Sequence, residues 1–108
     1  MEQYCIVLST FETEDQAKPV IDRVLSEKLA ACIQVLNIGS HYVWNGALCN
    51  DKEVLVLFKT SSRLYEELKC LLEEIHPYDT PEIIRIPIQS GSEGYLRWID
   101  EVTKQSTY

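Results

Sequence analysis

The amino-acid sequence predicts an α+β fold, in which two helices cover one face of an antiparallel sheet. Apolar and β-branched runs typical of strands alternate with segments whose apolar residues have helical spacing. The dipeptide Asn45-Gly46, the strongest short signal for a two-residue hairpin turn, lies between two long strand-like arms. The resulting order is β-α-β-β-α-β followed by one more helix. This is the ferredoxin-like split β-α-β pattern with a long central hairpin and an added C-terminal helix.

Length and charge limit the classes of function. The 108 residues are enough for one domain, residues 1–108, with a single core. A net charge of −7 argues against binding a phosphate backbone, which needs clustered cations. No apolar run approaches the roughly 20 residues of a membrane span, and Met1-Glu2-Gln3 starts no secretory signal. We therefore expect a cytoplasmic protein without nucleic-acid or membrane partners.

The first strand and helix occupy the N-terminal part of the chain. Residues Tyr4–Leu8 form a short apolar run that suits a central strand. Thr13 with Gln16 three residues later fits a helix capping box. Pro19 lies past the first turn, so either the helix begins nearer Asp15 or its first turns are distorted. The apolar positions of this helix recur at helical spacing and are Ala17, Val20, Ile21, Val24 and Leu25.

The segment Ala31–Thr60 is predicted to be one long hairpin with its turn at Asn45-Gly46. Gly39 and residues 50–52 are candidate sites for bulges in its two arms. Each arm of about 14 residues reaches roughly 46 Å at 3.3 Å per residue. A compact domain of this size has a diameter near 34 Å, so the hairpin should overhang by roughly 10 Å. Because the overhang is rich in aromatic and aliphatic residues, we expect oligomerisation to bury it.

The second half of the chain contains a helix, a strand and a last helix. Ser61 or Ser62 is expected to cap the helix, and Pro77 to stop it. Ile83–Ile88 is a strand, and Pro87 places its end at an edge or a bulge. The apolar stripe of the first of these helices is Leu64, Leu68, Leu71, Leu72 and Ile75, and that of the last is Tyr95, Trp98, Ile99 and Val102.

The connector between the second helix and the last strand holds an unusual set of polar residues. Pro77 and Pro81 stiffen it, so side chains are held there at low entropic cost. His76, Asp79 and Glu82 offer a nitrogen and oxygen ligand set for a divalent metal ion. The alternative is a plain helix-to-strand turn with a surface histidine. The four cysteines lack the C-x-x-C spacing of zinc sites and are expected to be buried free thiols.

Five motifs in register resemble the CutA divalent-cation-tolerance family. This resemblance implies a ferredoxin-like protomer in a tight homotrimer, similar to the trimeric PII signalling proteins. It also implies a cytoplasmic protein linked to tolerance of copper and other divalent cations, and eukaryotic relatives are associated with acetylcholinesterase anchoring. The motifs are Leu29-Ala30-Ala31-Cys32, Tyr42-Val43-Trp44-Asn45-Gly46, Lys59-Thr60, His76-Pro77-Tyr78-Asp79-Thr80-Pro81-Glu82-Ile83 and Tyr95-Leu96-Arg97-Trp98-Ile99.

The resemblance also implies site residues. Copper-binding members have a cysteine where Ser9 stands and a His-His pair where this chain has Ile75-His76. Only His76 remains, so we expect weak binding of Cu(II) or Zn(II), joined by His41 if the fold brings it close. A ligand cleft with aromatic walls and one carboxylate–ammonium pair is implied by Trp44, Glu53, Lys59, Tyr78, Glu82 and Trp98. The alternative for these aromatic residues is packing at a subunit interface.

Three functional hypotheses follow. The leading hypothesis is a trimeric, metal-responsive protein without a required cofactor, which binds copper or another divalent cation weakly. The alternative is a PII-like small-ligand sensor or a trimeric scaffold without metal specificity. An enzyme is not expected, because the acidic loop Thr10–Asp15 would repel the phosphate that acylphosphatases of this fold bind, and no nucleophile or phosphate-loop motif occurs.

Overall fold

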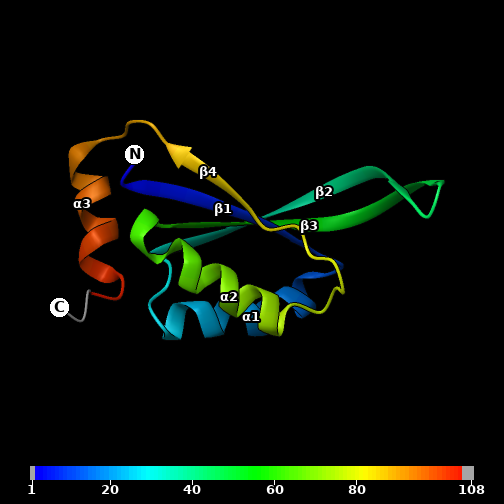
Figure 1. The fold of residues 1–108 in the computed structure, drawn as a ribbon, viewed down its shortest axis with the longest axis horizontal. Coiled ribbons are helices and arrows are strands. Elements are labelled where there is room, and N and C mark those ends of the chain that lie inside the picture. Colours follow the sequence, from blue (N-terminus) through cyan, green and yellow to red (C-terminus); the bar gives the residue numbers. More distant parts are fainter. Residues whose placement is uncertain (1, 106–108) are drawn as a thin grey trace.

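The computed structural model describes residues 2–105 as one four-stranded antiparallel sheet with three helices. Figure 1 shows α1 and α2 on one side of the sheet, α3 at one end and the hairpin turn at the other. The strand order β2-β3-β1-β4 confirms the predicted fold class. The elements are β1 (Tyr4–Phe11), α1 (Glu14–Ser26), β2 (Cys32–Trp44), β3 (Ala47–Ser61), a 3₁₀ turn (Ser62–Leu64), α2 (Tyr65–Ile75), β4 (Ile84–Ile88) and α3 (Glu93–Val102).

Helix α1 begins where its capping residue predicts. The Thr13 hydroxyl accepts a hydrogen bond from the Gln16 N–H at 3.1 Å, and Glu14 and Asp15 fill the first turn. Pro19 lies inside the helix, where it has no N–H to donate. The proline therefore does not displace the start of the helix from Glu14.

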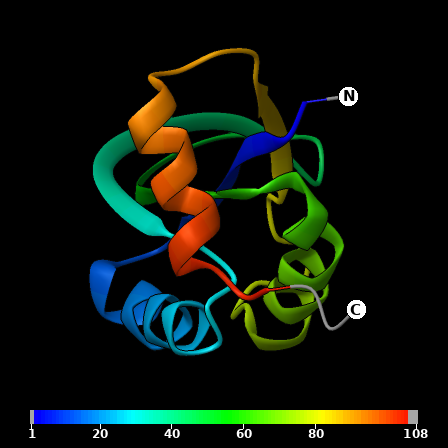
Figure 2. The same cartoon turned by 90° about the vertical axis from the view of Figure 1, so that its left-hand side faces the viewer.

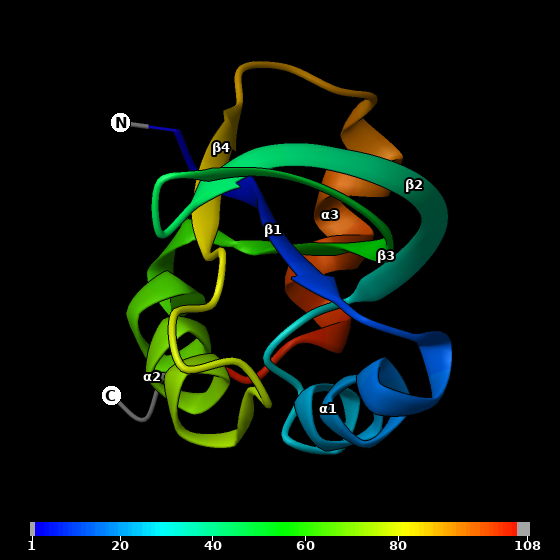
Figure 3. The ribbon, with the colours of Figure 1, turned by 90° about the vertical axis from the view of Figure 1, so that its right-hand side faces the viewer.

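The β2–β3 hairpin pairs without interruption. Its register runs from Cys32 opposite Lys59 to Trp44 opposite Ala47 with no offset, so the predicted bulges are absent. At Gly39 an added Cβ would meet no atom within 4 Å. Figures 2 and 3 show that the hairpin bends as a smooth curve instead. At its tip both turn residues have positive φ, 51° for Asn45 and 76° for Gly46, as a type I′ turn requires.

The core lies between the sheet and the pair α1 and α2. Alternate side chains of β1 and β3 point into it and meet the apolar stripes of the two helices, which Figure 2 shows side by side. Burying each large side chain contributes about 1.5–3 kcal/mol. The fully buried members include Val7, Phe11, Val24, Val56, Phe58, Leu68 and Leu72.

The start of α2 differs from the prediction. Neither Ser61 nor Ser62 makes a side-chain cap, and the helix instead begins through the 3₁₀ turn. The Ser61 hydroxyl does not cap the helix because it donates instead to the Asp100 carboxylate at 2.6 Å. Helix α2 ends at Ile75, two residues before Pro77, as predicted. Pro87 lies in β4, which is an edge strand as its proline requires.

Helix α3 is fastened to the sheet by one carboxylate. Asp100 accepts hydrogen bonds from the hydroxyls of Ser61 and Tyr4, each at 2.6 Å, while the neighbouring Ile99 is fully buried. Burial by itself raises the pKa of Asp100, but the hydrogen bonds from Ser61 and Tyr4 outweigh it and hold the pKa below its usual value. The hydroxyl pair therefore holds α3 against the end of the sheet remote from the hairpin turn.

The molecule is elongated, with extents of 47, 26 and 21 Å. The outer half of the β2–β3 hairpin projects beyond the other strands and the helices, as Figure 1 shows. Within residues 2–105, no helix combines the length and the apolar character needed to cross a membrane. The projecting hairpin leaves large apolar side chains in solvent, Leu48 at 90% exposed and Val43 at 66%.

Two glycines in the hairpin form a matched pair for testing the turn. We predict that Gly46→Ala lowers the free energy of unfolding by about 1–2 kcal/mol, because a side chain is disfavoured at positive φ. Gly39→Ala should change it by less than about 0.5 kcal/mol, because that position is open and φ is not positive. Urea unfolding followed by circular dichroism measures both variants. Equal losses in the two would contradict the turn geometry.

Candidate functional site

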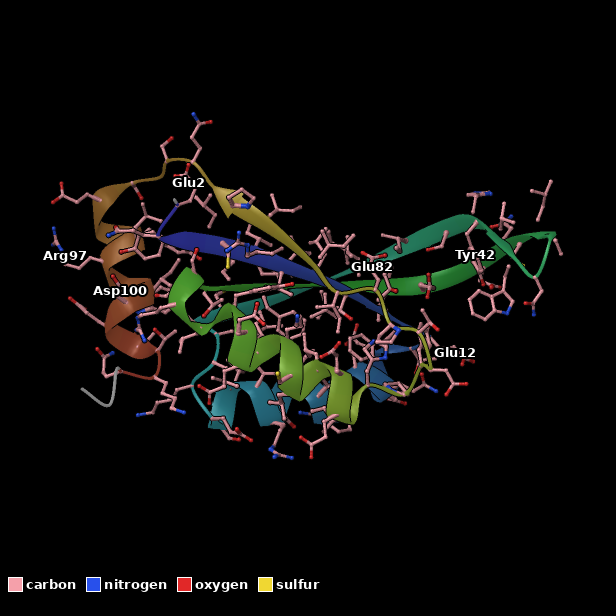
Figure 4. The ribbon with its side chains drawn as sticks, in the orientation of Figure 1. Glu2, Glu12, Tyr42, Glu82, Arg97 and Asp100 are labelled. Atoms are coloured by element: carbon pink, nitrogen blue, oxygen red, sulfur yellow. The ribbon has the colours of Figure 1, made fainter. Side chains whose placement is uncertain are left out.

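A cleft of about 690 Å³ lies between the hairpin and the connector that follows α2. We call it the acidic cleft. The side chains of Glu12, Tyr42 and Glu82 lie at this end of the molecule, whereas Arg97 and Asp100 lie at the opposite end, as Figure 4 shows. The residues that line the acidic cleft are Thr10, Glu12, Tyr42, Trp44, Asp51, Lys52, Glu53, Tyr78, Asp79, Thr80 and Glu82.

Negative charge dominates this lining. Five carboxylates face one ammonium group, that of Lys52, which leaves an excess of four negative charges around the cleft. Burial and the nearby Glu53 charge raise the pKa of Glu82 above its ordinary value. The Glu53 and Glu82 carboxylates therefore repel each other, and a cation placed in the cleft would relieve that repulsion.

Two tyrosines hold carboxylates in place across the cleft. The Tyr78 hydroxyl donates to Glu53 at 2.8 Å, and the Tyr42 hydroxyl donates to Asp51. Burial and then the Glu53 hydrogen bond raise the pKa of Tyr78, while the Asp51 hydrogen bond raises the pKa of Tyr42 to about 12. Both phenols therefore stay protonated at neutral pH and act as donors.

His76 lies behind the cleft and is 8% exposed, so the interpretation as a surface histidine is wrong. Its ring stacks on Phe11 with centroids 4.3 Å apart and an angle of 16° between the planes. Nε2 lies 2.9 Å from the Thr10 carbonyl oxygen and 3.1 Å from Ser9 Oγ, and Nδ1 accepts the Tyr78 N–H at 3.0 Å. Burial lowers the pKa of His76, although the Thr10 hydrogen bond and the Glu53 charge oppose this.

The proposed metal ligands are not brought together. Asp79 and Glu82 line the acidic cleft, but His76 uses both of its ring nitrogens behind it. His41 lies on β2 opposite Asn50 and does not line the cleft. Within residues 2–105, no three side chains of His, Cys, Asp or Glu are grouped closely enough to hold a metal ion.

The cysteines offer no alternative metal site. All four are free, as expected, but only Cys5 is buried. Cys32 and Cys49 are half-buried and Cys70 is exposed, so the expectation that all four thiols are buried is wrong. Cys49 lies on the projecting part of the hairpin, and Cys70 lies on α2.

The residues implied for a ligand cleft fall into two groups. Trp44, Glu53, Tyr78 and Glu82 line the acidic cleft, whereas Lys59 and Trp98 do not. The Lys59 ammonium lies 5.5 Å from the centre of the Tyr95 ring, which in turn contacts Trp98. Lys59 follows Glu53 by six residues on the same face of β3, which separates them by roughly 20 Å. No Glu53–Lys59 pair therefore forms within one copy of the chain.

Sequence reasoning missed part of the cleft. Glu12, Tyr42, Asp51 and Lys52 line it but were not proposed as site residues. A signal for two of them was present, because side chains at alternate positions of a strand share a face. That rule places Tyr42 with Trp44 on one arm of the hairpin and Asp51 with Glu53 on the other.

The charge coupling in the cleft can be tested directly. We predict that Glu53→Gln lowers the pKa of Glu82 toward its ordinary value, because removing a nearby negative charge favours ionisation. The amide oxygen introduced by this substitution can still accept a hydrogen bond from the Tyr78 hydroxyl, so the cleft geometry is kept. NMR titration of the side-chain carboxyl carbons measures the shift. Glu66→Gln, at an exposed position in the first turn of α2, is the control and should leave the pKa of Glu82 unchanged.

Comparison with known proteins identifies the family. Residues 5–102 match the model of the CutA1 divalent ion tolerance protein family. The chain is 42% identical over 100 residues to the divalent-cation tolerance protein CutA of Pyrococcus horikoshii, covering 93% of this chain and 98% of that one. CutA1 from Oryza sativa superposes with a TM-score of 0.91 at 34% identity over 97% of both chains. The periplasmic divalent cation tolerance protein CutA from Archaeoglobus fulgidus gives 0.90 at 32% identity over 94% of this chain and 99% of that one. The chain belongs to the CutA1 divalent ion tolerance protein family.

Proposed function

We propose that this protein serves divalent-cation tolerance as a homotrimer that binds cations weakly in its acidic clefts, without a catalytic step or a required cofactor. The observation that carries the proposal is the excess of four negative charges around one cleft. Clefts lined by charge of one sign concentrate counter-ions from solution. The family name, divalent ion tolerance protein, agrees with a cationic ligand.

Binding in this cleft is expected to be loose. Because no compact ligand set is present among residues 2–105, a cation would keep part of its hydration shell and contact Glu53, Asp79 and Glu82 through water. Oxygen ligands suit divalent ions in general, and affinity should follow the usual order with copper above zinc and nickel. The cation therefore contributes charge neutralisation rather than a rigid coordination centre.

The open face of the sheet supports the trimer. Helices α1 and α2 cover one face only, and the other face is lined by aliphatic side chains, which we call the open sheet face. Contiguous exposed apolar surface of this kind marks an interface. Three of its members, Leu36, Ile84 and Ile86, are 53, 49 and 43% exposed. The aliphatic residues that the register places on this face are Ile6, Leu8, Leu36, Ile38, Leu55, Leu57, Ile84, Ile86 and Ile88.

The proposed trimer would also bring Lys59 and Trp98 close to the residues that line the acidic cleft. In a closed ring each copy presents its acidic end to a neighbour, so Lys59 and Trp98 of one copy can complete the cleft of the next. Charge complementarity favours this arrangement, because Lys59 makes no ion pair within residues 2–105 and the acidic cleft has carboxylates in excess. The carboxylate–ammonium pair would then form between subunits.

A second candidate function is a sensor for a small organic cation. The walls of the cleft contain three aromatic rings, those of Tyr42, Trp44 and Tyr78, beside the carboxylates. Aromatic faces attract ammonium groups, and the cleft volume lies within the usual range for small-molecule sites. Competition between a diamine and a divalent ion for one site would favour this function.

We also propose a cytoplasmic location. The support is that all four cysteines are free, as is usual where thiols are kept reduced. The Archaeoglobus fulgidus relative is described as periplasmic, so fractionation of cells followed by immunodetection of the chain decides between the two compartments.

For the assembly, we predict a single species near three times 12.5 kDa in sedimentation at micromolar protein. Ile86→Asp should dissociate it, because a charge would be buried in the apolar interface. Leu25→Asp is the matched control, since Leu25 is 42% exposed on α1 and should leave the assembly intact. A monomeric wild-type protein would contradict the trimer. A trimer that places Lys59 far from the neighbour's cleft would contradict only the shared cleft.

For cation binding, we predict that Glu53→Gln combined with Glu82→Gln weakens Cu(II) and Zn(II) binding roughly tenfold, or about 1.4 kcal/mol. The control is Glu66→Gln combined with Glu101→Gln, which removes the same charge from exposed positions outside the cleft. Affinity should also fall with added salt, and as pH drops through the raised pKa of Glu82. Titration calorimetry measures all of this. Equal losses in the two double variants would show that only the overall net charge matters.

A further inference from the structure

The His76 imidazole is a buried polar ring whose hydrogen-bonding capacity is fully used. It follows α2 at an extended backbone position, φ −68° and ψ 137°, directly before Pro77. One ring nitrogen faces the end of β1 and the other faces the connector. The ring stacks on Phe11 with centroids 4.3 Å apart, and the tilted Tyr78 ring lies with its centroid 4.9 Å away.

These partners fix which nitrogen carries the proton. The Thr10 carbonyl can only accept, so the Nε2 atom 2.9 Å away from it must be the N–H donor. The Tyr78 backbone N–H can only donate, so Nδ1 must hold the lone pair. The neutral Nε2–H tautomer is the form that satisfies both bonds, and it leaves no lone pair for a metal ion.

We infer that His76 is a positioning residue and not a metal ligand: it fastens the connector to the end of β1, so that Tyr78 and Glu82 face the acidic cleft. The inference rests on the proposed function of that cleft. A continuous path carries the effect, from Thr10 on β1 through His76 to the Tyr78 backbone, and from the Tyr78 hydroxyl to Glu53 on β3.

A metal ion at His76 would have to break this path. Coordination through Nδ1 displaces the Tyr78 N–H, and coordination through Nε2 requires loss of its proton and of the Thr10 bond. Ser9, the other polar side chain at this ring, is fully buried and supplies a hydroxyl rather than a thiolate. Soft ions such as Cu(I) prefer thiolate ligands, so this pocket does not fit the copper set that the family resemblance implies.

The first test uses the wild-type protein and needs no variant to fold. Nitrogen-15 NMR of the imidazole rings at neutral pH should report the Nε2–H tautomer for His76 without any metal. On titration with Zn(II), the His76 ring signals should stay in place, with the exposed His41 as internal comparison. An Nδ1–H tautomer, or His76 signals that move first with Zn(II), would overturn the inference. The tautomer tests the inference about His76 even if the acidic cleft binds no cation. Absence of cation binding would instead count against the proposed function.

The second test separates positioning from coordination. His76→Gln can still donate from its amide nitrogen toward Thr10, whereas His76→Ala keeps neither bond. A positioning role predicts that Zn(II) affinity in His76→Gln stays within about threefold of wild type, while His76→Ala loses clearly more. Coordination by the imidazole predicts equal, large losses in both variants and would overturn the inference. His41→Gln is the matched control, and the pKa of Glu82 in each variant reports whether the connector has moved.

Discussion

Both faces of the sheet are apolar, but α1 and α2 cover only one of them. This imbalance governs the rest of the structure. On the covered face, Val7, Val56 and Phe58 meet α1 and α2 and form the core. On the open sheet face, aliphatic residues of all four strands remain partly in water, and α3 closes only the end remote from the hairpin turn. Because removal of apolar surface from water is favourable, covering this face, as in the proposed trimer, would stabilise the structure further.

The long hairpin has consequences for the site as well as for assembly. Its uninterrupted register carries Glu53 and Lys59 on one strand and one face, yet roughly 20 Å apart. A ligand of ordinary size cannot contact both from a single copy. The same elongation places Tyr42 and Trp44 over the connector, so one wall of the acidic cleft comes from the hairpin and the other from residues 78–82. The geometry of the cleft therefore depends on how firmly the connector is held.

Local signals predicted the elements that depend on local interactions. The Thr13 cap, the Asn45-Gly46 turn and the stop before Pro77 each involve residues within a few positions, and each is confirmed. Two of the errors involve partners distant in sequence. Ser61 gives its hydroxyl to Asp100, 39 residues away, and His76 is buried by contacts with Thr10 and Phe11 across more than half of the chain. The sequence motifs named five residues of the cleft, Trp44, Glu53, Tyr78, Asp79 and Glu82, but could not reveal that Lys59 lies elsewhere.

The chemistry of the cleft fits a broad response to cations better than a selective one. Thiolate and imidazole ligands in fixed geometry select particular ions, whereas carboxylates that act partly through water accept many divalent ions with modest affinity. At the position where the family resemblance implies a thiolate, this chain has the Ser9 hydroxyl, and the nearby His76 imidazole already bonds the connector through the Tyr78 N–H. The ligand groups that face the cleft are carboxylates, two of which accept hydrogen bonds from tyrosine hydroxyls. Under the function proposed above, a cation in the cleft would relieve the repulsion between Glu53 and Glu82, and Glu53 also accepts the Tyr78 hydroxyl that links β3 to the connector. Glu53 is therefore the residue through which a bound cation and the position of the connector would influence each other.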